Sequence, residues 1–137
     1  MNDFSETIKS KIPDLECSNA PASEKTIQDI QQQLDCLFGP QLKSYLLDFG
    51  YLAHGSNEMY GVNERQLLDS DLVKVSKMLH IDFPITQGMV AVDNHGDGDY
   101  ILCDSQDMIY EYIPSLKNEL IPLKQNLLNY ILARMSE

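Results

Sequence analysis

Apolar residues recur every three or four positions in several parts of the chain, which is the spacing of amphipathic helices. Ser23 stands at the start of one such stretch as an N-cap, and Pro122 marks the first turn of the last one. Gly39 and Gly50 interrupt the pattern and separate neighbouring helices. The periodicity predicts helices over residues 1–12, 23–38, 40–49, 67–80 and 123–135.

After Gly88 the pattern changes to short apolar runs separated by Gly, Asp, Asn and Ser residues. Such runs, bounded by turn residues, are typical of strands in an antiparallel meander. A loop over residues 51–57 and a short strand over residues 58–62 precede them. The meander strands are predicted over residues 89–92, 100–103 and 108–113. This order predicts an α+β fold, a single domain in which an antiparallel β-sheet meander packs against N-terminal helices and a C-terminal helix.

A chain of 137 residues is long enough to hide roughly two-thirds of its unfolded surface in one core. Residues 1–22 are predicted to form an N-terminal helix and connector, and residues 23–137 the α+β domain. No apolar run approaches the ~20 residues of a membrane span, and the N-terminus lacks the pattern of a signal peptide. The cysteines lack Cys-x-x-Cys spacing and are odd in number, which indicates reduced thiols. We therefore expect a cytoplasmic protein.

Charge narrows the range of partners. The formal net charge is −11, so nucleic acids and anionic membranes would be repelled, whereas a basic protein would be attracted. Solubility alone also accounts for an acidic surface. Between Lys77 and Lys117 the chain has no Lys or Arg. The same interval contains Asp82, Asp93, Asp97, Asp99, Asp104, Asp107 and Glu111.

The segment Asp93–Tyr100 concentrates three of these carboxylates beside two glycines. Carboxylates without basic neighbours hold a cation, perform acid–base chemistry or present a negative surface to a partner. As an EF-hand calcium loop the segment has a glycine in the right place, but His95 stands where Asp or Asn belongs. Strands rather than helices are predicted on both sides. The sequence therefore favours a hairpin turn and predicts no metal site.

Motifs for catalysis are missing from the sequence. It has no Gly-x-Ser-x-Gly, no His-Glu-x-x-His and no phosphate-binding loop. Cys36 and Cys103 fall on apolar faces, where a buried structural thiol is expected rather than a nucleophile. The sequence thus predicts neither an enzyme nor a cofactor, and leaves protein recognition as the favoured class of function.

Four segments, taken in order, are similar to a known family. They contain a helix end with Gly-Pro followed by a Tyr-x-x-x-Phe-Gly helix, a short strand ending in glycine, a hairpin with a Gly-Asp turn, and a Tyr-containing strand. The segments are Leu37–Gly50, Glu58–Val62, Met89–Asp104 and Ile109–Tyr112. Together with the C-terminal helix they resemble the SUKH superfamily over about residues 23–135. The chain departs from that pattern in having no Trp.

The resemblance implies one of two functions, because the superfamily includes bacterial immunity proteins and a yeast regulator of cell-wall assembly. The first is an immunity protein that neutralises a basic protein toxin, such as a nuclease. The alternative is a regulatory or scaffold interaction domain with no toxin partner. Tyrosines beside the acidic residues supply apolar anchors for a contact face, although core packing accounts for some of them equally well. The predicted contact residues are Tyr60, Asp93, Asp97, Asp99, Asp104, Glu111 and Tyr112.

Overall fold

Two antiparallel sheets and five α-helices make up the described part of the chain in the computed structural model, which covers residues 3–62, 71–96, 98–116 and 118–136. The predicted α+β class is confirmed. Leu67 and Leu68, predicted to be helical, lie outside the described residues. The helices are α1 (Asp3–Lys11), α2 (Glu24–Leu34), α3 (Pro40–Asp48), α4 (Asp71–Asp82) and α5 (Leu127–Met135), and η2 (Pro84–Thr86) is a short 3-10 turn.

The larger sheet is the predicted meander with one additional strand. Its strands lie in the order β4 (Val90–Asn94), β5 (Tyr100–Cys103), β6 (Met108–Tyr112) and β7 (Ile121–Asn126). The prediction that a helix starts near residue 123 is wrong, because β7 occupies that segment. Pro122 is compatible with β7 because a strand at the sheet edge does not need every backbone N–H. Helix α5 begins only after Asn126, whose side chain accepts a hydrogen bond from the Asn129 N–H at 2.9 Å.

A smaller sheet forms where the sequence predicted a connector and a loop. It contains β1 (Glu16–Cys17), β2 (Leu52–His54) and β3 (Asn57–Glu58), in that order. Strands of two or three residues are too short to show alternation, so their pairing has no pattern in the sequence. Tyr60, predicted to lie in a strand, follows β3 and donates its backbone N–H to the Val92 carbonyl at 2.8 Å. The segment after β3 is therefore held against β4.

One face of the larger sheet packs on the main core with α1, α2, α3 and α5. Phe4, Ile8 and Ile12 belong to this core, so the N-terminal segment packs with the rest of the chain. Leu37, which falls within the amphipathic helix predicted over residues 23–38, is instead 75% exposed. The reason is that α2 ends at Leu34, and Asp35 then adopts a left-handed conformation with φ of 51°.

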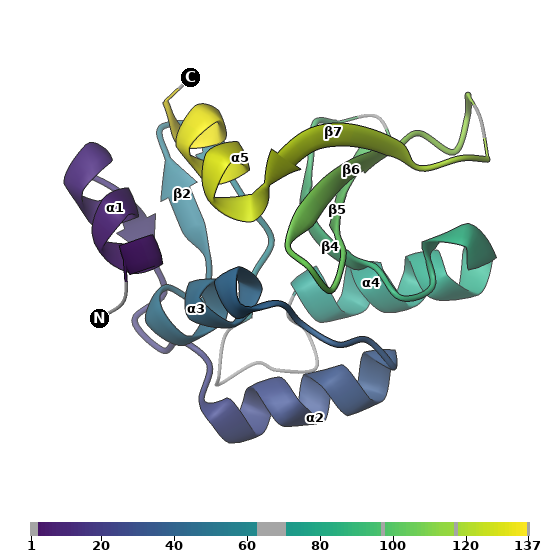
Figure 1. Cartoon of the computed structure of the whole chain (residues 1–137), viewed down its shortest axis with the longest axis horizontal. Helices are drawn as coiled ribbons and strands as arrows, with labels where there is room; N and C mark the ends of the chain where they lie inside the picture. The colour runs from purple at the N-terminus through teal and green to yellow at the C-terminus, as the bar shows by residue number, and fades with distance from the viewer. Residues whose placement is uncertain (1–2, 63–70, 97, 117, 137) are drawn as a thin grey trace.

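Helix α4 covers the opposite face of the sheet (Figure 1). Leu79 packs there against Ala91 and Leu102, and the Ser76 hydroxyl accepts a hydrogen bond from the Ala91 N–H at 2.9 Å. Figure 1 also shows α5 continuing from the end of β7 toward α1 and β2, away from α4. Among the described residues, no helix has the length and apolar character needed to cross a membrane. Alternate residues of β4, β5 and β6 face either α4 or the main core.

Candidate functional site

The turn between β4 and β5 has the hairpin geometry that its glycines predict. Gly96 and Gly98 have φ angles of 94° and 80°, in the left-handed region that favours glycine. The Asn94 side-chain oxygen accepts a hydrogen bond from the Gly96 N–H at 3.0 Å, and the Asp99 N–H donates to the Gly96 carbonyl at 3.0 Å. Strands flank the turn, so it is not the helix-flanked loop of an EF-hand. Asp97, one of the predicted contact residues, lies outside the described residues.

Asp93 is buried, and its prediction as a surface contact is wrong. Its side chain is 0% exposed. One carboxylate oxygen accepts hydrogen bonds from Arg134 Nε at 2.9 Å and from the Tyr130 hydroxyl at 2.5 Å, both on α5, and the other accepts the Asn94 N–H at 2.8 Å. The basic partner lies 41 residues along the chain, so the local sequence gives no sign of it. Asp93 is a paired structural carboxylate.

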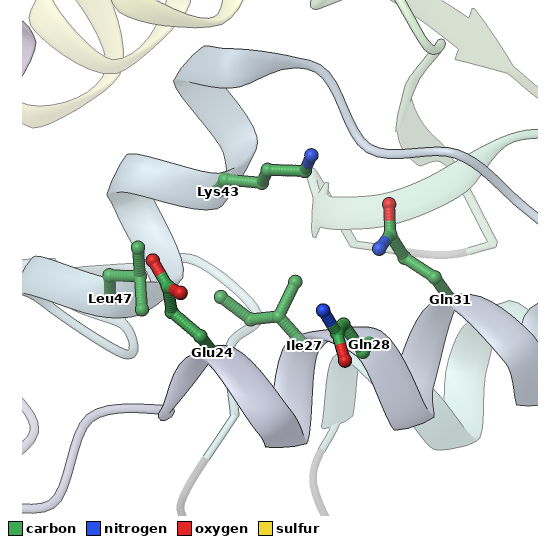
Figure 2. Close-up of a pocket in the computed structure, with 6 residues that line it drawn as sticks. All are labelled: Glu24, Ile27, Gln28, Gln31, Lys43 and Leu47. Carbon is green, nitrogen blue, oxygen red and sulfur yellow. The ribbon is translucent and has the colours of Figure 1, made fainter.

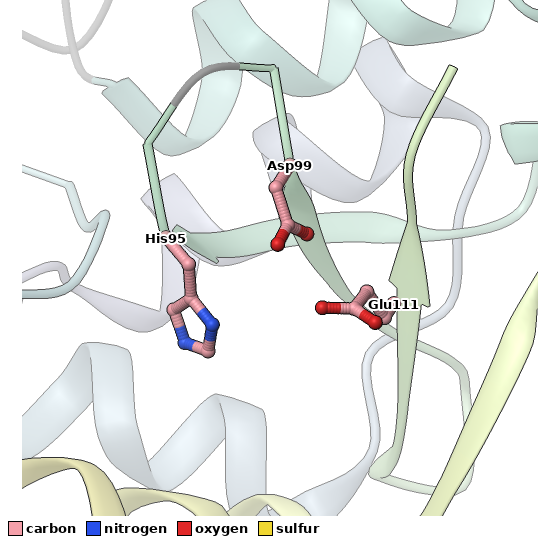
Figure 3. Close-up of side chains that lie close together, drawn as sticks. All are labelled: His95, Asp99 and Glu111. Atoms are coloured by element: carbon pink, nitrogen blue, oxygen red, sulfur yellow. The ribbon is translucent and has the colours of Figure 1, made fainter. Parts of the chain in front are cut away.

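Asp99 and Glu111 lie together at the same end of the sheet, as Figure 3 shows. Glu111 on β6 stands opposite Ile101 on β5, two positions beyond Asp99. Burial, and then the negative charge of Asp99, raise the pKa of the Glu111 carboxyl. His95 completes the group, and one ligand atom from each of the three side chains lies within 4.8 Å of the others. The sequence analysis considered His95 only as part of a calcium loop, and it did not group His95 with Glu111 because only the strand register brings Glu111 to this turn.

Asp104 occupies the opposite end of β5. Its Oδ1 accepts hydrogen bonds from the Gln106 and Met108 N–H groups at 2.8 and 2.9 Å, and the Tyr110 hydroxyl donates to Oδ2 at 3.2 Å. These bonds shape the turn between β5 and β6. Asp104 is therefore separated from Asp99 by the length of β5, and the predicted acidic residues do not form one continuous face.

Asp107, in the same turn, is a structural residue that the sequence did not reveal. It is 3% exposed, and its carboxylate accepts the Gln41 and Leu42 N–H groups at 2.9 and 3.0 Å. Gly39 precedes α3 and has no side chain to cap it, so Asp107 caps that helix from a distant part of the chain. A Cβ at Gly39 would lie 2.4 Å from the Asp107 carboxylate, which explains why glycine suits this position.

The two predicted contact tyrosines have different environments. Tyr112 is 1% exposed and packs edge-on against Phe83, with ring centroids 5.6 Å apart, on the α4 side of the sheet. Its prediction as a contact residue is therefore wrong, since neighbouring strand residues point to opposite faces and Glu111 takes the other one. Tyr60 is half-buried, and its hydroxyl accepts a hydrogen bond from the Asn94 side-chain amide at 2.7 Å. Of these two tyrosines, Tyr60 is the one that keeps partial access to solvent.

Comparison with known families agrees with this geometry. The family model SUKH_6, described as SMI1-KNR4 cell-wall, matches residues 24–131. The chain belongs to the SUKH superfamily. The match extends from α2 into α5 and so includes the whole larger sheet with its acidic turn. A comparison with curated proteins gives no significant match. The SUKH assignment identifies a domain of the immunity-protein or SMI1/KNR4 type.

The cysteines of the chain differ in exposure. Cys36 and Cys103 are buried, as predicted, whereas Cys17 is exposed. Burial raises the pKa of Cys36 to about 11 and raises that of Cys103 well above its ordinary value. Because the thiolate is the nucleophile, the two buried thiols are unreactive at neutral pH.

A groove between α2 and α3 is the other concave feature of interest in the SUKH domain (Figure 2). It has a volume of about 180 Å³, and its described lining includes Glu24 and Lys43 among amide and apolar side chains. The Gln31 side-chain oxygen accepts the Phe38 N–H at 2.8 Å, so Gln31 holds the connection between the helices. The lining mixes opposite charges and contributes no negative face. The acidic end of the sheet is the stronger candidate site.

Proposed function

We propose that the protein is an immunity protein that binds and neutralises a cognate basic protein toxin, with nucleases as the favoured toxin class. The family assignment supports an immunity-type or SMI1/KNR4-type domain, and the net charge of −11 favours a basic partner. Nuclease clefts are basic because they hold phosphates, so an acidic protein surface is complementary to them. The proposed activity is binding, without catalysis.

The observation that carries this proposal is the pair Asp99 and Glu111. The two carboxylates face each other at the sheet end, and neither takes part in the ion pairs found among the described residues. No Lys or Arg of the described residues pairs with either carboxylate, whereas Arg134 pairs with Asp93. A negative patch of this kind accelerates encounter with a basic partner and sets its orientation.

Apolar surface lies next to this pair. Ile121 on β7 stands directly opposite Glu111 and is 36% exposed. Leu116, in the connection between β6 and β7, is 72% exposed. Protein interfaces combine an apolar centre with a polar rim, and this end of the sheet offers both. The proposed contact face therefore consists of Asp99, Glu111 and Ile121.

Charge reversal tests the face once the partner toxin is in hand. The toxin is sought among proteins captured from the native host lysate and identified by mass spectrometry, and its inhibition is then measured with purified components. We expect Asp99→Lys/Glu111→Lys to weaken binding at least about tenfold, a loss of about 1.4 kcal/mol, because attraction becomes repulsion. Wild-type association should also slow as salt concentration rises.

A matched control separates the face from net charge. Glu16→Lys/Glu58→Lys changes the total charge equally but alters exposed residues of the smaller sheet. This variant should inhibit like the wild type. Equal inhibition by both double variants, with each folded by circular dichroism, would contradict the proposed face.

The second candidate is a regulatory or scaffold interaction domain. The observation that favours it is the description of the matching family model, SMI1-KNR4 cell-wall. In that case the captured proteins would be signalling or wall-synthesis proteins, and purified chain would inhibit no toxic activity. A single basic toxin captured in near-equal amount would contradict this second candidate.

A further inference from the structure

We infer that His95, Asp99 and Glu111 bind a divalent transition-metal cation, with Zn²⁺ as the best-matched ion. The three side chains come from the β4–β5 turn and from β6, and point toward one another in Figure 3. Their ligand atoms lie within 4.8 Å of one another. The site contains a nitrogen donor as well as carboxylates, so it differs from an ordinary acidic surface patch.

An unsatisfied oxygen of Asp99 is the first independent sign of a ligand. Asp99 Oδ1 is buried and has no hydrogen-bond partner among the described residues. A buried carboxylate oxygen without a partner is costly, and native structures nearly always satisfy such atoms. When ionised, the nearby Glu111 carboxylate adds repulsion rather than a donor, so a cation between the two carboxylates would satisfy both.

The orientation of His95 is the second sign. Its ring stacks on Tyr130 with centroids 6.2 Å apart, and its Nε2 lies 2.9 Å from the Tyr130 hydroxyl. That hydroxyl donates its proton to Asp93, so its oxygen accepts the Nε2–H of His95. The remaining nitrogen, Nδ1, then carries the lone pair, and it faces the carboxylates in Figure 3. Metal-binding histidines are regularly held through the opposite ring nitrogen in this way.

The donor set decides between ions. One imidazole nitrogen and two carboxylate oxygens suit Zn²⁺, with one position left for water, whereas Ca²⁺ prefers six to eight oxygens. Zinc bonds of about 2.0–2.2 Å require the ligand atoms to close by roughly 1 Å, which rotation of the partly exposed Asp99 and Glu111 side chains allows while His95 stays against Tyr130.

The test is a titration of the purified, untagged full chain with ZnCl₂, followed by calorimetry and thermal melting. We expect equimolar binding, and a melting temperature that rises with Zn²⁺ and falls back on addition of EDTA, because the ion binds the folded state. CaCl₂ at the same concentration should give a smaller shift. Absence of Zn²⁺ binding at millimolar concentration would overturn the inference.

Variants localise the ion. His95→Asn and Glu111→Gln should each weaken Zn²⁺ binding at least about tenfold. His54→Gln and Cys17→Ser, which remove two other metal-binding side chains outside the site, should leave the affinity unchanged. Nuclear magnetic resonance should show the Nδ1 signal of His95 shifting on titration. Unchanged affinity in His95→Asn, with the variant folded, would overturn the assignment even if the protein binds Zn²⁺ elsewhere.

This inference does not depend on the proposed toxin partner. The cation is measured with the chain alone, and toxin inhibition is measured in EDTA. Failure of one experiment therefore leaves the other result intact, although both sites use Asp99 and Glu111.

Discussion

The two turns at the ends of β5 are both rich in aspartate, yet they use it in opposite ways. In the β5–β6 turn, Asp104 and Asp107 accept hydrogen bonds from backbone N–H groups, and Asp107 thereby caps α3. In the β4–β5 turn, the buried Asp99 Oδ1 has no hydrogen-bond partner within the described part of the chain, and the side chain faces Glu111. The first turn stabilises the fold, and the second carries the proposed binding site.

The difference indicates that donor supply, and not the number of acidic residues, separates structural carboxylates from those of the proposed site. A carboxylate that accepts several hydrogen bonds contributes to stability, and removing either partner is costly. A carboxylate that faces another carboxylate contributes little or opposes folding. Substitutions in the two groups should therefore have effects of different size and sign on the free energy of unfolding.

The largest effect is expected at Arg134, which neutralises Asp93. Arg134→Leu would leave a buried carboxylate without its charged partner, so we expect a loss of about 3–5 kcal/mol in urea unfolding at neutral pH. Adding Asp93→Asn should recover part of the loss, since it removes the unpaired charge. A loss below about 1 kcal/mol, as at a surface ion pair, would contradict the structural role of Asp93.

The next largest effect is expected at Asp107. Asp107→Ala removes the acceptor for two N–H groups of α3 and should reduce the unfolding free energy by about 2 kcal/mol. Asp107→Asn should cost less, because it keeps one acceptor oxygen and tolerates the φ of 64° at this position. Equal losses in the two variants would show that capping is not the cause.

A double-mutant cycle sharpens this prediction. Gly39→Ala alone should cost about 1–3 kcal/mol, because its Cβ would overlap the Asp107 carboxylate. The same substitution should cost much less in the Asp107→Ala background. Additive losses would mean that the two residues do not interact.

A small effect of opposite sign is expected at Asp99. Asp99→Asn replaces a carboxylate with an amide that can donate to Glu111, so stability should rise slightly, by about 0.5 kcal/mol in metal-free buffer. Urea unfolding in EDTA measures the change. A loss as large as that of Asp107→Ala would mean that Asp99 has structural partners after all.

The smallest effect is expected for His54 and Asp14, which are hydrogen-bonded to each other but little buried. His54 Nδ1 lies 2.6 Å from the Met135 carbonyl and Nε2 lies 3.0 Å from Asp14, so both ring nitrogens favour a proton. The hydrogen bond to Asp14, followed by that to Met135, raises the pKa of His54 above 6.5. Its stabilisation is present below the unfolded pKa of 6.5 and is lost as pH rises through the raised folded value.

The measurement is a melting-temperature profile against pH. His54→Gln should melt below the wild type in mildly acidic buffer and approach it in mildly alkaline buffer. Asp14→Asn should show the same convergence, and high salt should reduce both differences. A constant difference across pH would contradict the protonated pair.

Periodicity in the sequence was enough to predict the helices of the core and the first three strands of the larger sheet. It was misleading at Pro122, since a proline suits both the first turn of a helix and an edge strand. The Asn126 cap was the available signal for the true start of α5. The strands of the smaller sheet had no such signal in the sequence, because two or three residues are too few to show a period.

The candidate site was partly predictable. Its location at the β4–β5 turn followed from the concentration of Asp and Gly there. The identity of its members did not, because burial of Asp93 depends on Arg134 and the approach of Glu111 depends on strand register. Contacts between distant residues set both, and no local spacing encodes them. Tyr112 was misplaced for the same reason, since its face of the sheet is fixed by packing against α4.

The unequal exposure of the thiols has a practical consequence. Cys17 is exposed on β1, while Cys36 and Cys103 are buried. A maleimide reagent at neutral pH will therefore attach to Cys17 alone in the native protein, on the sheet that does not carry the acidic turn. A fluorophore placed there can report partner binding without altering the proposed face. Modification of the other two thiols then requires opening of the core, so a mass spectrum of alkylated chains directly counts the molecules that have unfolded.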